Sequence, residues 1–158
     1  MPSTNPYEAP FEYQVQRVKT AVTKSLNTLN AFNTDISILD YLGVNSWDEV
    51  VAYFEEKRAL WNETNPNRPM TLTNSQIDHI KPTSSFKNKS LGMKMYLSNH
   101  YTNLQPLLQD DNQWKGSHWS SEDELIWKTK IVLQRFSYVY YPCNVFQPSL
   151  EKTVFNHM

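Results

Sequence analysis

The sequence predicts an α+β domain that is mostly helical. Two observations favour this class. Apolar residues recur at three- and four-residue steps near both ends of the chain, which is the spacing of one buried helical face. Between these regions lie two short segments with strand character, residues 76–80 and 103–108. We therefore expect a small two-stranded unit flanked by N-terminal and C-terminal helices.

Length and composition narrow the class of protein. At 158 residues the chain can bury a core without disulfides, and the lone Cys143 excludes an internal disulfide and a cysteine-based zinc knuckle. The net charge of −1 argues against a strongly basic nucleic-acid coat protein, although residues 72–119 are richer in bases than the acidic stretch 35–65. The chain shows neither a charged-then-apolar leader nor a long apolar run. We expect a cytoplasmic protein that does not span a membrane.

The first part of the chain is expected to be an irregular arm and a helical module. Residues 1–10 contain three prolines and form the arm, and residues 11–69 form the module. An apolar stripe runs through Phe11, Val15, Val18, Val22, Leu26 and Leu29, with Arg17, Lys19 and Lys24 on the other faces. This helix either docks on the core with a solvent-exposed outer side or lies along the phosphate backbone of a nucleic acid. We favour the docked helix.

Two further helices complete this module. The apolar residues of 36–42 predict a short helix, and Gly43 suits the left-handed position that ends it. Ser46 and Glu49 have capping-box spacing, which predicts the start of a longer helix. That helix would bury Val50, Val51, Phe54 and Trp61, and the prolines at 66 and 69 follow its end.

Residues 70–120 are expected to form the core of the domain. The strand at 76–80 ends before Pro82, and residues 83–99 are expected to be a long polar connection. Pro106 places the second strand at an edge or makes it very short. Residues 109–115 begin a helix with an acidic first turn, which suits the helix dipole.

Residues 121–158 are expected to form a C-terminal helix and tail. Ser121 and Glu124 have capping-box spacing and predict the start of the helix. Its apolar face would contain Leu125, Ile126, Val132, Leu133, Phe136 and Tyr140, and Pro142 would end it. The tail to Met158 is expected to pack back onto the domain.

Three short motifs in the core carry a family resemblance. They are Ile77-Asp78-His79-Ile80, Asn103-Leu104-Gln105-Pro106-Leu107 and Asn112-Gln113-Trp114-Lys115-Gly116. An Asp-His pair closing a strand, an Asn opening a second strand and an Asn in the next helix resemble the HNH endonucleases, which are ββα-metal nucleases. The segment Leu42-Gly43-Val44-Asn45-Ser46 is similar to the helical module of phage and viral members, so the resemblance spans roughly residues 17–120. The chain departs from many members by lacking two Cys-x-x-Cys pairs.

The resemblance implies a role for each motif residue. His79 would be the general base, Asp78 and Asn112 would bind one divalent metal, and Asn103 would orient the loop that carries His79. An imidazole with an ordinary pKa of about 6.5 suits proton transfer near neutral pH. Hard oxygen ligands suit Mg²⁺ or Mn²⁺ better than zinc. The expected reaction is hydrolysis of DNA phosphodiester bonds to 5′-phosphate and 3′-hydroxyl ends.

Several residues keep two interpretations. Lys81, Lys87, Lys89 and Lys115 are candidate phosphate contacts, but loop lysines also solubilise, and Lys115 could lie in water beside the acidic helix start. His100 is an auxiliary candidate at the phosphate or metal, or else a packed histidine. We also keep two other functions, a cleavage-silent nucleic-acid-binding protein of the same fold and an interaction protein that uses its helical half.

The biological setting is inferred from the contexts in which members of the family usually occur and from the asparagine-rich composition. These favour a phage, virus or mobile element, and hence the host cytoplasm. One site of this kind cuts one strand, so the enzyme would nick DNA, or cut both strands as a homodimer.

Overall fold

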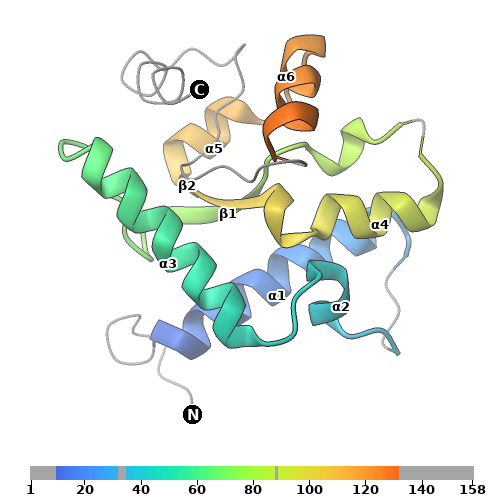
Figure 1. The fold of residues 1–158 in the computed structure, drawn as a ribbon, viewed down its shortest axis with the longest axis horizontal. Helices are drawn as coiled ribbons and strands as arrows, with labels where there is room; N and C mark the ends of the chain where they lie inside the picture. The colour runs from blue at the N-terminus through green and yellow to red at the C-terminus, as the bar shows by residue number, and fades with distance from the viewer. Residues whose placement is uncertain (1–9, 32–34, 88, 132–158) are drawn as a thin grey trace.

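The computed structural model describes residues 10–31, 35–87 and 89–131. Over these residues the fold is mixed α+β and mostly helical, with a small antiparallel sheet, as the sequence predicted (Figure 1). Of the arm predicted at residues 1–10, residues 1–9 lie outside the described residues, and Pro10 is the first residue of a helix. The part of the expected C-terminal helix and tail beyond residue 131 also lies outside the described residues. Among the described helices, none has the length and apolar character needed to cross a membrane.

The N-terminal half contains three helices. Helix α1 (Pro10–Thr28) buries Val15, Val18, Val22 and Leu26, which are members of the predicted stripe. Helix α2 (Ile38–Leu42) begins after Ser37 and ends at Gly43, whose φ of 73° is the left-handed conformation expected there. Helix α3 (Trp47–Thr64) begins at the Ser46 cap, and Val50, Val51, Phe54 and Trp61 are buried.

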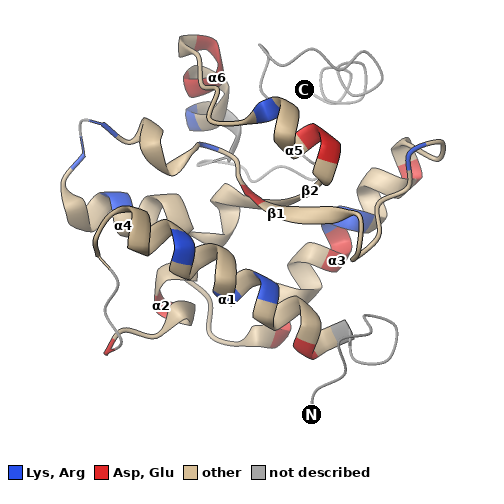
Figure 2. Cartoon of the chain, turned by 180° about the vertical axis from the view of Figure 1, so that it is seen from behind, with Lys and Arg blue, Asp and Glu red and all other residues tan. Residues whose placement is uncertain are grey.

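The sheet has two antiparallel strands, β1 (Ser75–His79) and β2 (Leu104–Leu108). Their register places Asp78 opposite Gln105 and Ile77 opposite Pro106. A two-stranded sheet has no central strand, so Pro106 is tolerated there. In both Figure 1 and Figure 2, α1 and α2 lie on one side of the strands, and α5 and α6 lie on the other.

The connection between the strands is not the unstructured segment expected from the sequence. It contains a 3₁₀ turn, η1 (Thr83–Ser85), helix α4 (Leu91–Asn99) and a second 3₁₀ turn, η2 (Tyr101–Asn103). Ser90 caps α4 by accepting a hydrogen bond from the Met93 N–H. Leu91, Met93 and Tyr96 remain exposed, while Met95 and Leu97 pack against the two cores. This sparse apolar face is why periodicity did not reveal the helix.

The last described elements are α5 (Gln109–Lys115), α6 (Ser121–Ile126) and a π-helical turn, η3 (Trp127–Ile131). The capping box of α6 is formed by Ser120 and Asp123, one residue before the predicted pair. Asp123 is fully buried and its shorter side chain reaches back to the Ser120 N–H. Glu124 is consequently available for other contacts. Leu125, expected on the apolar face, is 63% exposed.

Two hydrophobic clusters hold these elements together. The larger joins α1, α2, α3 and β2 through residues that include Val22, Tyr41, Phe54 and Leu104. The smaller contains Ile80, Phe86 and Trp127, and so fixes the loop after β1 against the start of η3. The segment that follows His79 is therefore held from outside the two-strand unit.

Candidate active site

The residues expected to carry the chemistry line one cleft of about 270 Å³. Asp78 and His79 come from the end of β1, and Asn112 comes from α5. Helix α1 supplies another part of the wall through Ala21, Lys24, Ser25 and Thr28. The Ser25 and Thr83 hydroxyls lie 2.9 Å apart and link this helix to the loop after His79.

A hydrogen bond fixes the tautomer of His79. Its Nε2 lies 2.9 Å from Asn99 Oδ1. The Asn99 amide nitrogen donates to Met95 O and Ser98 Oγ, so its oxygen is the acceptor that faces the imidazole. Nε2 of the neutral ring must then carry the proton, and Nδ1 keeps its lone pair. Among the described residues, Nδ1 has no hydrogen-bond partner.

The surroundings of His79 favour this neutral form. Burial lowers the pKa of His79 below its ordinary value of 6.5. The hydrogen bond to Asn99 and the Asp78 carboxylate oppose this shift, and the Lys115 ammonium adds to it. An imidazole that is neutral near pH 7 with an available Nδ1 can accept a proton from water.

Asp78 is buried and paired. Its Oδ1 accepts a hydrogen bond from Lys115 Nζ at 3.0 Å, and its Oδ2 accepts one from Gln105 Nε2 at 3.0 Å. Lys115 is also buried, and its ammonium donates a second bond to the His79 carbonyl oxygen at 2.9 Å. The ion pair therefore ties α5 to the end of β1.

Asn112 presents its carbonyl oxygen as an available donor atom. The amide nitrogen donates to Gln76 Oε1 at 2.7 Å, which sets the orientation of the side chain. Within the described part of the chain, Asn112 Oδ1 has no hydrogen-bond partner. Gln76 lies on β1, so the strand that carries Asp78 also orients Asn112.

The donor atoms fit a hard divalent cation. A carboxylate has about four lone-pair sites, so Asp78 retains capacity beside its two hydrogen bonds. With the Asn112 oxygen it would provide two protein ligands, a number typical for Mg²⁺, which keeps several waters. Clusters of three or more His, Cys, Asp or Glu side chains suited to a metal are absent from the described residues. The expected set has one carboxylate and one carboxamide, so such a cluster is not required.

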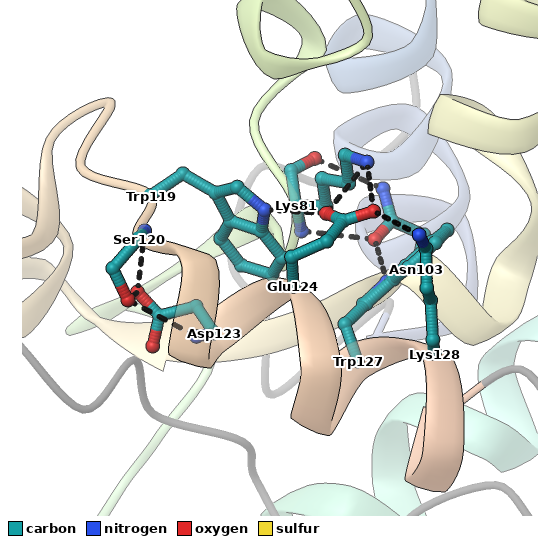
Figure 3. A network of polar contacts seen from close by, with 8 residues as sticks. All are labelled: Lys81, Asn103, Trp119, Ser120, Asp123, Glu124, Trp127 and Lys128. Carbon is teal, nitrogen blue, oxygen red and sulfur yellow. Dashed lines mark hydrogen bonds and ion pairs between the residues drawn. The ribbon is translucent and has the colours of Figure 1, made fainter.

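Asn103 forms side-chain-to-backbone bonds to the loop after His79. Its Oδ1 accepts from the Lys81 N–H at 2.9 Å, and its Nδ2 donates to Lys81 O and Ser98 O. Trp127 Nε1 donates to the same Oδ1 at 2.9 Å, as Figure 3 shows. Asn103 thus fixes the loop after His79 through hydrogen bonds to its backbone. A role of Asn103 in catalysis stays a prediction.

The structure corrects the surface positions expected for two lysines. Lys81 is buried, pairs with Glu124 at 2.7 Å and lies over the Trp127 ring. Lys115 is buried against Asp78, so it neither lies in water nor projects toward a phosphate. Each ammonium group is therefore buried and already paired with a carboxylate. Lys87 and Lys89 are exposed, so their phosphate contacts stay a prediction.

His100 does not line the cleft. Its Nδ1 lies 2.7 Å from Thr102 Oγ1, and its ring packs against Gly43. A Cβ at position 43 would lie 2.6 Å from this ring, so Gly43 is needed for space as well as for its positive φ. The geometry supports the interpretation of His100 as a packed histidine.

Sequence reasoning missed the residues that orient the motif side chains. The sequence predicts a loop at Asn99, yet Asn99 ends α4 and bonds to His79. Gln105 lies within one of the three motifs, but its bond to Asp78 depends on a strand register that the sequence does not give. Gln76 gave no signal of its contact with Asn112, because that contact joins a strand to a helix.

Comparisons with known proteins assign no family to this chain. Neither protein-family models, nor curated proteins, nor solved structures match the chain.

Proposed function

We propose that this protein is a metal-dependent DNA endonuclease that uses His79 as the general base. The observation that carries the proposal is the cleft in which His79, Asp78 and Asn112 meet. They come from a strand end and a separate helix, and each is oriented by a second residue. The packing of the core does not by itself require a base and two oxygen ligands to line the same cleft.

Each residue has a distinct part. His79 Nδ1 takes the proton from the attacking water, while Asn99 keeps the opposite ring nitrogen protonated. Asp78 and Asn112 would hold the Mg²⁺ or Mn²⁺ ion. When bound, that ion supplies positive charge to the phosphate oxygens and to the departing 3′ oxygen. Asn103 fixes the backbone that follows His79.

Plasmid cleavage tests the proposal. Supercoiled DNA should be nicked or linearised by the full-length protein with Mg²⁺ or Mn²⁺, and EDTA should stop the reaction. His79→Ala should reduce the rate by about 10²- to 10⁴-fold, the usual contribution of general base catalysis. His118→Ala is a matched control, because His118 is exposed and does not line the cleft. Undiminished cleavage by His79→Ala would exclude this mechanism.

A second candidate is a cleavage-silent nucleic-acid-binding protein. One observation favours it: the Lys115 ammonium bonds directly to Asp78 Oδ1 and already neutralises the carboxylate. In that case wild-type protein would bind DNA, fail to cleave it with either metal and show no saturable binding of Mn²⁺. Calorimetric titration with Mn²⁺ in the absence of DNA separates the two candidates.

A further inference from the structure

A second concave site lies next to the cleft. It has a volume of about 540 Å³ and is lined by residues that include Lys81, Lys87, Lys89, Lys128, Ser85 and Ser121. We call it the basic pocket. It is formed by the loop after β1 together with the segment from the start of α6 to η3. Figure 3 shows several of its lining residues, with Glu124 between Lys81 and Lys128.

The pocket has a positive charge. Four lysines and one glutamate are among the described residues that line it. Glu124 is already bound by Lys81 Nζ at 2.7 Å and lies 3.6 Å from Lys128 Nζ. Burial alone would raise the pKa of Glu124, but hydrogen bonds from Lys81 and Trp119 outweigh it and lower that pKa. Glu124 thus stays ionised and occupied, and Lys87, Lys89 and Lys128 expose their charges to solvent.

The lining matches an anion with several acceptor oxygens. Exposed ammonium groups come from two separate segments, Lys87 from the loop and Lys128 from η3. Hydroxyl groups from Ser85 and Ser121 lie in the same lining and can donate to phosphate oxygens. Positive groups combined with short hydroxyl donors are the usual contacts to a nucleic-acid backbone.

The position of the pocket links it to the cleft. Thr83 lines the cleft and Ser85 lines the basic pocket, so the cleft and the basic pocket lie next to the same short turn, η1. Two residues of chain span at most about 7 Å. Successive nucleotides on one strand of a duplex rise by about 3.4 Å, so a strand in the cleft reaches the pocket within a few nucleotides.

We propose that the basic pocket binds a backbone phosphate of the DNA strand whose scissile bond lies in the cleft. This inference rests on the proposed function, because it assumes that the cleft receives DNA. The pocket would hold the strand in register while leaving the reacting groups to the cleft. Its contacts are to phosphate and therefore give affinity without base specificity.

Salt-dependent binding tests this inference without any cleavage. The full-length protein in EDTA is titrated against a short fluorescent DNA duplex over a range of KCl concentrations. The test variant is Lys87→Gln/Lys128→Gln, which removes one charge from each segment that lines the pocket. The control is Lys19→Gln/Lys94→Gln, which removes the same net charge from positions outside the cleft and the pocket.

The expected result is a weaker and less salt-sensitive complex for the test variant alone. The pocket is proposed to bind one phosphate, and losing one phosphate contact lowers the slope of log K against log[salt] by about 0.9. The same slope corresponds to about eightfold in affinity for each contact at 0.1 M salt. Equal changes in the test and control variants would overturn the proposal, because they would report net charge alone.

The outcomes also separate the two proposals. If the protein cleaves plasmid but the two variants bind DNA alike, the basic pocket is not a phosphate site and the nuclease proposal stands. If the test variant alone loses affinity but the wild type never cleaves, the pocket stands and the nuclease proposal fails. Equal thermal unfolding midpoints for both variants and the wild type show that the comparison is between folded proteins.

Discussion

The hydrogen bond between Asn99 and His79 gives the sharpest test of how the site works. Asn99→Ala removes the acceptor from His79 Nε2 and leaves the imidazole in place. A hydrogen bond of this kind contributes about 0.5–1.5 kcal/mol net, and each 1.36 kcal/mol is tenfold in rate. We therefore expect cleavage to slow by between about twofold and about tenfold. This loss is much smaller than for His79→Ala, because the base itself remains.

Asn65→Ala is a matched control for this change. Asn65 is also a buried asparagine at the end of a helix, and its amide donates to the carbonyl four residues earlier, as that of Asn99 does. It lies outside the cleft. Substitution there should lower stability by a similar amount and leave the cleavage rate unchanged once the protein is folded.

Two measurements check the prediction. The pH dependence of the wild-type rate should show an acid limb below pH 6.5, because burial lowers the pKa of His79 and only the neutral ring accepts a proton. Nitrogen-15 spectra of the imidazole should show the proton on Nε2 and a bare Nδ1 in the wild type. A proton on Nδ1, or equal rates for Asn99→Ala and the wild type, would refute the role assigned to Asn99.

Three further predictions concern stability and the metal. The pKa of buried Lys57 is lowered from 10.5 to about 8 by desolvation, so the unfolded chain binds more protons between these values and the free energy of unfolding should rise with pH across that window. Lys57→Met should abolish this slope and stabilise the protein at pH 7 by at most about 3 kcal/mol in chemical denaturation. Lys115→Gln removes a cation from Asp78 and should tighten Mn²⁺ binding by about tenfold in calorimetry, with lower stability without metal; unchanged affinity would argue against Asp78 as a ligand. Trp127→Phe keeps the ring but removes the donor to Asn103, and should cost about 1 kcal/mol in thermal unfolding and slow cleavage without weakening DNA binding.

The sequence predicted elements that have a strong local signal. The apolar stripe of α1, the left-handed Gly43 after α2 and the Ser46 cap of α3 each depend on residues close together in the chain. The two strands and α5 were also located, because Pro82 and the acidic first turn of α5 mark boundaries. Local propensity is sufficient where nothing distant competes with it.

What the sequence did not predict depends on tertiary contacts. Helix α4 was missed because its exposed Leu91, Met93 and Tyr96 obscure the face that packs. The capping pair of α6 was misplaced by one residue, since Ser120 and Ser121 both have an acid three residues later and only burial selects Asp123. Local spacing could not distinguish them.

The same distinction applies to the site. The family resemblance predicts Asp78, His79 and Asn112 as site residues, and these three line one cleft. It could not identify the partners that orient them, because Asn99 and Gln105 become neighbours of the motif only after α4 forms and the strands pair. Motif residues are recognisable because the proposed chemistry would restrict their type. Their partners need only supply an acceptor or a donor, and many residue types can do so.

The contacts of Trp127 and Glu124 argue that the site does not end at the boundary expected near residue 120. Trp127 completes the bonds to Asn103, and Glu124 neutralises the buried ammonium of Lys81. The Lys81–Glu124 pair is partly buried, with side chains 6% and 26% exposed, so removing Glu124 should cost less than the about 3–5 kcal/mol typical of a fully buried pair. The destabilisation would affect the loop to which Asn103 is hydrogen-bonded. This loop is the backbone segment that follows His79. The start of the C-terminal segment is therefore part of the structure that positions His79, although it contains no motif residue.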